Sequence, residues 1–178
     1  MRKFILSTTF VFLISLSSTL QSHPSSFADL VETLSPAVVS IASTTYTDTG
    51  NTVTITPSSS SSKIMIFARG GYSLGATDDT VQGGIKLVRN STTLVSPMAD
   101  TAGPYEIALE LTSGTHINNL NAYYNYCFLD TPNTTSACVY KLQARVYNTA
   151  NSHHINFGNT GGGGGGQSQQ MIAQEVSG

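Results

Sequence analysis

From Thr45 onward, apolar and polar side chains alternate with a period of two residues. The alternation is strict over residues 105–111, and residues 139–147 form another clear strand pattern. In the second run, one face carries Tyr140, Leu142, Ala144 and Val146. Side chains of a β-strand point alternately to opposite faces of the sheet, so a period of two is typical of half-buried strands and differs from the 3.6-residue period of a helix.

Several more segments fit this description, and polar turns such as residues 48–51 separate them. We expect strands around residues 53–55, 85–89 and 171–176. The apolar run within residues 63–68 predicts a central strand that is covered on both faces. Many short strands joined by polar turns predict an all-β domain, a β-sandwich or jelly roll.

The chain carries few charges. Charged residues make up 10% of its 178 residues, against about 25% in typical soluble proteins. The formal net charge is -2 at pH 7. Such a chain lacks the broad positive field that steers proteins toward nucleic acids or anionic lipids, so we expect no nucleic-acid partner.

Residues 1–22 have the features of a secretory signal peptide. A positively charged start is followed by an apolar run from Phe4 to Leu16 and then by a polar stretch. The run is shorter than the ~20 residues that a membrane-spanning helix needs, so we expect export without a stable membrane anchor. Residues 26–35 then place apolar side chains at helical spacing, and Pro36 ends this predicted short helix. A strand is predicted at residues 38–41.

The block SFADLVETLSPAVVSIAS, within residues 23–44, resembles the entrance to the trypsin-like domain of HtrA/DegP-family periplasmic proteases. In that family this part of the chain carries no catalytic group. The family's serine would lie in a Gly-Asn-Ser-Gly-Gly loop, but residues 158–162 have Thr160 in that place, and His116 lacks the expected context. We therefore predict no enzymatic activity, no catalytic residue and no cofactor. A truncated or degenerate HtrA-like serine peptidase is an alternative hypothesis.

Residues 45–178 resemble a different family. The blocks that carry this resemblance are YTDTGNTVTITPSSSSSKIMIF, IKLVRNSTTLVS, FLDTPNTTSACVYKLQARVYN and QMIAQEVSG. Their order and spacing are similar to those of a β domain of bacteriophage tail fibres and other virion structural proteins. The resemblance implies a β-sandwich head that forms a homotrimer at the virion tail and contacts a glycan or protein of the host surface. It implies no particular binding residues.

The two resemblances meet near residues 42–46, as in a natural fusion or a misjoined gene. Our hypothesis is a non-enzymatic structural or binding β module like a tail-fibre head. An exported adhesin or envelope protein is a second alternative. The signal peptide predicts a periplasmic or extracellular location, and the phage resemblance implies the virion tail.

Five aromatic and imidazole side chains form the candidate binding surface. Tyr123, Tyr124 and Tyr126 offer rings on which sugars stack, because such rings combine apolar faces with hydroxyl groups. Alternation along a strand points some of these rings inward, so core packing is the other interpretation. His153 and His154 complete the set. Neighbouring residues of a strand face opposite sides and rarely bind one metal ion together, so a solvated turn is the other interpretation of the histidines.

Asp78, Asp79 and Asp100 carry the hard oxygen ligands that calcium prefers. Their spacing differs from that of an EF-hand loop, which favours a polar loop. No metal site is predicted.

Cys127 and Cys138 are the only cysteines, and they flank the turn-rich segment of residues 130–135. A hairpin closed at this turn would bring the two thiols close together, and an oxidising compartment would let them form a disulfide. Two free thiols are the equally open alternative.

Overall fold

The computed structural model describes residues 30–35, 38–78, 80–95, 107–110, 120–158 and 169–176. These residues form antiparallel strands in two sheets, and a single 3-10 turn, η1 (Ala150–Ser152), lies among them. The predicted all-β fold is confirmed. The predicted signal peptide lies outside the described residues.

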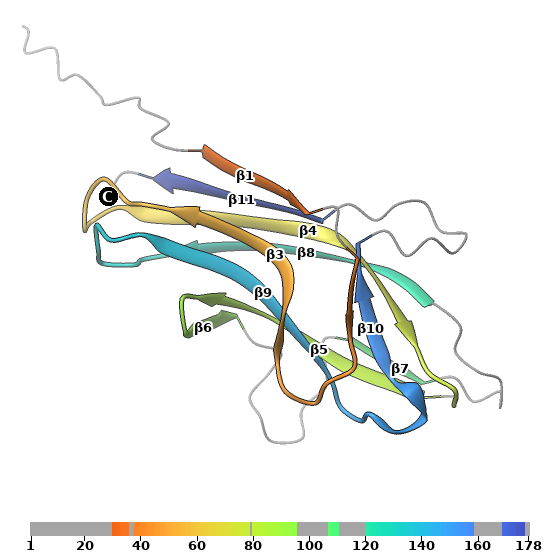
Figure 1. Cartoon of the computed structure of the whole chain (residues 1–178). Helices are drawn as coiled ribbons and strands as arrows, with labels where there is room; N and C mark the ends of the chain where they lie inside the picture. Colours follow the sequence, from red (N-terminus) through yellow and green to blue (C-terminus); the bar gives the residue numbers. More distant parts are fainter. Residues whose placement is uncertain are drawn as a thin grey trace, which may run out of the picture.

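Sheet A contains β1 (Leu30–Ser35), β2 (Val39–Ile41), β4 (Lys63–Gly75), β8 (Leu120–Asp130), β10 (His154–Phe157) and β11 (Gln169–Val176). Its strand order is β1-β11-β4-β10-β2, and β8 pairs with β4. The long β4 is therefore central: β8 follows one side of it, and β11 and β10 share the other side. β1, β11, β4 and β8 run alongside one another, with β10 and β2 at one end (Figure 1).

Sheet B contains β3 (Thr47–Ile55), β5 (Thr80–Arg89), β6 (Thr92–Val95), β7 (Ile107–Glu110) and β9 (Cys138–Val146). Its order is β3-β9-β5-β6, and β7 pairs with β5. Alternate residues of each sheet face the other sheet and form one core between the two layers.

The core confirms the period-two pattern of the sequence. In β9 every second residue is buried, and the side chains of Tyr140, Leu142, Ala144 and Val146 are 0% exposed. β11 alternates in the same way, with Met171 and Ala173 buried. Each fully buried aliphatic side chain stabilises the fold by about 1.5–3 kcal/mol relative to an exposed one.

The prediction that residues 63–68 are covered on both faces is wrong. Ile64, Ile66 and Ala68 are buried, but Met65 is only half-buried and Phe67 is 41% exposed. The two sheets enclose a single core, so this half of β4 buries one face only. All six residues from Gly70 to Gly75 are buried, which shows that coverage of both sides begins further along the strand.

Residues 30–35 form strand β1 where the sequence predicted the second half of a short helix. Six residues of β1 pair antiparallel with β11, from Leu30 opposite Gln174 to Ser35 opposite Gln169. The inter-strand hydrogen bonds of this tertiary pairing override the local helical spacing. The first half of the predicted helix, residues 26–29, lies outside the described residues. The strand predicted at residues 38–41 is confirmed as β2.

Residues on both sides of positions 42–46 belong to the same fold. β1 and β2 lie in sheet A with β11 and β10, which come from the distant end of the chain. The carbonyl of Ser43 accepts a hydrogen bond of 2.8 Å from the backbone N–H of Val146 in sheet B. Residues 42–46 therefore form the connection from sheet A to sheet B.

The turn predicted at residues 48–51 is instead a bulge inside β3. The register with β9 shifts between Asp48 and Thr52, and Gly50 takes a φ of 81° that favours glycine. The bulge turns Thr49 and Asn51 inward, where they are 1% and 0% exposed. Two of the polar residues that suggested a turn, Thr49 and Asn51, are therefore buried and form hydrogen bonds inside the fold.

Candidate functional site

The outer face of sheet A, which points away from the core, exposes large apolar side chains. Strand register places Phe67 of β4 beside Cys127 of β8 and Ile172 of β11 on this face. Tyr123 and Leu129 of β8 share the face, and they are 79% and 44% exposed. Exposed apolar surface of this kind marks interaction sites when it is contiguous.

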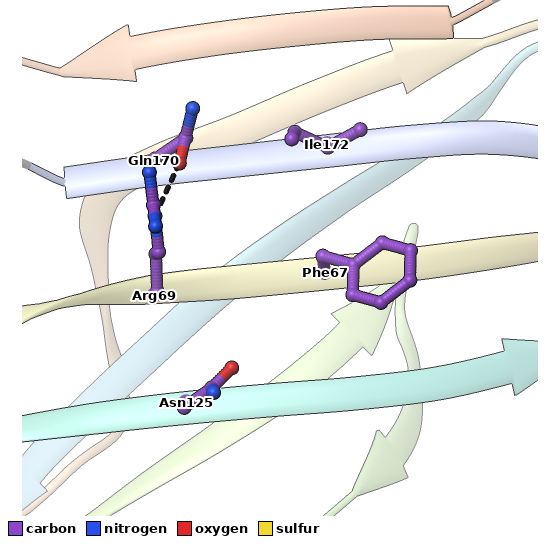
Figure 2. A pocket seen from close by; sticks show the side chains of 5 residues that line it. All are labelled: Phe67, Arg69, Asn125, Gln170 and Ile172. Carbon is purple, nitrogen blue, oxygen red and sulfur yellow. Dashed lines mark hydrogen bonds between the residues drawn. The ribbon is translucent and has the colours of Figure 1, made fainter.

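A shallow depression of about 350 Å³ lies within this face and is lined by Phe67, Arg69, Asn125, Gln170 and Ile172. Figure 2 shows these side chains standing on three adjacent strands, with Phe67 and Arg69 on β4 between Asn125 and Gln170. The guanidinium Nε of Arg69 donates a hydrogen bond to the Gln170 side-chain oxygen. Gln170 Nε2 in turn donates to a carboxylate oxygen of Glu32 in β1 at 2.5 Å. This chain of contacts fixes the Arg69 side chain over the sheet.

The depression combines an exposed ring with planar polar groups. Phe67 offers an apolar face, while the guanidinium of Arg69 and the amides of Asn125 and Gln170 offer donors and acceptors in fixed planes. Such a set matches a ligand with an apolar face and hydroxyl or carboxylate groups at its edge. Among the residues of the described ranges, no three His, Cys, Asp or Glu side chains gather in a way that could hold a metal ion.

Of the three candidate tyrosines, Tyr123 lies on this outer face and the other two turn inward. Tyr124 is 8% exposed; its hydroxyl donates to the side-chain oxygen of Gln169 and accepts a 3.0 Å bond from Asn51. Burial raises the pKa of Tyr124. Tyr126 is partly buried, and its hydroxyl donates to the carbonyl of Ile85 at 3.2 Å. The interpretation as core packing is thus right for Tyr124 and Tyr126.

The candidate histidines lie at a different place from the depression. His153 is 5% exposed, and its Nε2 lies 2.9 and 3.0 Å from the two carboxylate oxygens of Asp78. Asn151 Nδ2 donates to the same carboxylate at 2.7 Å. These hydrogen bonds, from His153 first and then Asn151, lower the pKa of Asp78. The structure therefore joins His153 with Asp78, and the interpretation of His153 as part of a solvated turn is wrong.

His154 is opposite Gly75 at the far end of β4, eight residues along that strand from Phe67. Its Nδ1 lies 2.7 Å from the carbonyl of Ser152. A Cβ at Gly75 would lie 2.4 Å from the imidazole ring, so a larger residue there would force the His154 side chain to move. Asp79 and Asp100, the other candidate calcium ligands, lie outside the described residues.

Cys127 and Cys138 are free thiols in the structure. The predicted hairpin between them is wrong, because β8 pairs with β4 in sheet A while β9 pairs with β3 and β5 in sheet B. Cys127 is exposed and Cys138 is buried in the core. Burial raises the pKa of the Cys138 thiol.

Sequence reasoning missed both the depression and a buried ion pair that joins the sheets. The carboxylate of Asp130 in β8 accepts hydrogen bonds from Arg89 at 2.5 Å and from the Tyr140 hydroxyl at 2.7 Å. Arg89 and Tyr140 belong to sheet B, so this cluster ties the two layers together. Arg69 directly follows the apolar run of β4, and a charged residue within a strand is a local sequence signal that the strand has an outer face.

The residues considered for peptidase chemistry, His116 and Thr160, lie outside the described residues. The described residues include no helix that is long and apolar enough to cross a membrane.

No protein-family model matches the chain, and a search of curated proteins finds no match. The chain is similar to a solved structure of dimeric latent PorU from Porphyromonas gingivalis, with a TM-score of 0.41 and 11% sequence identity. The match covers 84% of this chain and spans 13% of the PorU chain.

Proposed function

We propose that this chain is a non-enzymatic binding module, comparable to a tail-fibre head domain, and that it binds a cell-surface glycan on the outer face of sheet A. The observation that carries the proposal is the depression around Phe67 and Arg69. A sugar ring has one apolar C–H face and hydroxyl groups around its edge. Stacking on Phe67 with hydrogen bonds to Arg69, Asn125 and Gln170 satisfies both features.

The position of the depression also supports a binding role. Its five lining residues come from three neighbouring strands, so the backbone hydrogen bonds of the sheet hold them in place. Binding groups on a rigid sheet lose little conformational freedom when a ligand arrives. Tyr123 extends the same face beyond the depression and offers a second ring for a longer saccharide.

A glycan array probed with the purified chain tests the proposal. We expect binding to a subset of saccharides and a loss of at least about tenfold in affinity for Arg69→Ala, because that variant removes a charged hydrogen-bond donor worth about 1.5–3 kcal/mol. Lys141→Ala is the matched control, since it removes one positive charge from the outer face of sheet B and should leave binding unchanged. Absence of any bound saccharide, or equal binding by both variants, contradicts the proposal.

The peptidase and adhesin alternatives remain predictions. The residues on which they depend, the signal-like start and the segment around Thr160, lie outside the described residues.

A further inference from the structure

β8 is the longest edge strand among the described residues. It pairs with β4 over eleven consecutive residues without a break in register, from Leu120 opposite Leu74 to Asp130 opposite Ile64. Within the described part of the chain, β4 is its only strand partner. In an antiparallel pair, every second residue of an edge strand directs its N–H and C=O groups outward. β8 therefore offers a row of backbone donors and acceptors.

The other described edges are protected in the ways that folded proteins commonly use. β2, β6 and β7 have only three, four and four residues. β1 has six residues and carries the exposed charge of Glu32, and the bulge at Asp48 interrupts β3. β8 has none of these features: it is long and regular, and its sequence LNAYYNYCFLD contains no proline.

The lack of unpaired charge on β8 allows a second copy of this chain to pair with it. The strand carries no charged residue from Leu120 to Leu129, and the terminal Asp130 is paired with Arg89. Two antiparallel β8 strands therefore place no unpaired like charges opposite each other. The neutral amide at the centre of the strand, Asn125, can pair with its own symmetry mate through one donor and one acceptor from each copy.

We propose that two copies of this chain pair antiparallel through β8, across a twofold axis beside Asn125. Asn125 is the central residue of Leu120–Asp130, so this register uses the whole strand. It places Tyr123 of one copy opposite Cys127 of the other. The two A sheets then form one continuous sheet, whose outer face carries two copies of the depression on the same side. This arrangement goes beyond the proposed binding function and gives it two sites on one surface.

The mass of the purified full chain in solution, measured by light scattering, is the first test. We expect twice the 18.8 kDa chain mass. A mass of one chain, or of three chains as the tail-fibre resemblance implies, overturns the twofold pairing.

Charge substitutions place the interface. Asn125→Lys puts two positive charges directly opposite each other and should weaken dimerisation at least tenfold. Gln174→Lys is the matched control, because Gln174 lies on the outer face of sheet A in β11, two strands away from the β8 edge. It should leave the dimer intact. Equal dissociation of both variants, or of neither, overturns the proposal; circular dichroism verifies that each variant is folded.

Cross-linking tests the register independently of affinity. Opposed residues of antiparallel strands have Cα atoms about 4.5–5.5 Å apart, within the range that a disulfide spans. The variant Tyr123→Cys should therefore form a reducible dimer with the native Cys127 of its partner under mild oxidation. The cross-link should disappear when Cys127→Ser is added, and Gln174→Cys should not form one. A dimer that fails to cross-link at Tyr123→Cys, or that cross-links equally at Gln174→Cys, overturns this register.

Discussion

The outer faces of the two sheets differ in the kind of side chain that they expose and in the contacts that these side chains make. On sheet B, Lys141 Nζ lies 2.8 Å from the Asp48 carboxylate, and the charged groups of Lys86 and Arg145 lie 4.3 and 4.7 Å from the centre of the Tyr46 ring. The side chains of this face thus contact one another. On sheet A, the exposed positions include large apolar groups, such as Phe67 at 41% and Tyr123 at 79% exposure, beside polar groups such as Arg69.

Under our proposal, this difference separates a solvated face from a binding face. Polar side chains that pair within their own sheet keep a surface soluble and leave little reason for a partner to dock. Exposed apolar side chains gain free energy when a partner removes them from water. Both sheets contribute equally to the core, so the choice of side chains on the outward positions alone distinguishes them. Substitutions on matched inward and outward positions test this comparison.

The largest effects are expected where the two sheets are alike, in the core. Ile66 in sheet A and Leu142 in sheet B are both 0% exposed. Replacing either with alanine should lower the free energy of unfolding by about 2–5 kcal/mol, measured by urea denaturation. Phe67→Ala is the outward control on the same strand as Ile66, and it should cost less than about 1 kcal/mol. A cost for Phe67→Ala as large as that for Ile66→Ala would show that sheet A is packed on its outer side as well.

The same contrast explains what the sequence could predict. The inward positions of β9 and β11 follow from alternation alone, because period two and burial coincide there. In β4 the alternation is hidden, because Met65 and Phe67 are apolar although they face outward. An apolar residue on an exposed face and an apolar residue in a core look the same in a sequence.

Buried polar contacts were beyond sequence reasoning for another reason. Asn51, Tyr124 and Gln169 come from three distant parts of the chain, and hydrogen bonds of the Tyr124 hydroxyl join the three buried side chains. His153 and Asp78 are likewise distant in the sequence, and a hydrogen bond joins them. Local composition marks such residues as turns or loops, since their partners become visible only when the strands are placed.

The second-largest effect concerns the ion pair that joins the sheets. Asp130→Ala should cost about 3 kcal/mol, because it leaves the buried Tyr140 hydroxyl and the partly buried Arg89 guanidinium without their shared acceptor. Tyr140→Phe removes one hydrogen bond and leaves the ion pair intact, so it should cost about 1–2 kcal/mol. Urea denaturation measures both. If both variants lower the free energy of unfolding by the same amount, the ion pair between Arg89 and Asp130 does not stabilise the fold.

A smaller effect is expected at Glu175, a charged residue in β11 that is 5% exposed. One of its carboxylate oxygens accepts hydrogen bonds from the backbone N–H and the hydroxyl of Ser58, at 2.8 and 2.6 Å. Burial raises the pKa of Glu175, but the hydrogen bonds from Ser58 and Ser62 outweigh burial and bring the pKa below its ordinary value of 4.5.

Because the pKa of Glu175 is lower in the folded state, its contribution to stability is present above pH 4.5 and is lost as the pH falls below that value. Glu175→Gln should cost about 1 kcal/mol at pH 7 and nothing at pH 3, as measured by urea denaturation at both values. A difference that persists unchanged at pH 3 would mean that the carboxylate charge has no role.

The smallest effect is expected on the outer face of sheet B. The side chain of Asp48 is 52% exposed. Partial burial raises the pKa of Asp48, but the hydrogen bonds from Lys141 and Gln143 together lower it by more, so the pKa is below its ordinary value. Asp48→Asn should lower the free energy of unfolding by less than about 1 kcal/mol, and added salt should reduce that difference because exposed pairs are screened. Glycan binding should not change. If Asp48→Asn lost glycan binding, the binding surface would have to lie on sheet B and not on sheet A, because this substitution leaves every residue of the Phe67 depression in place.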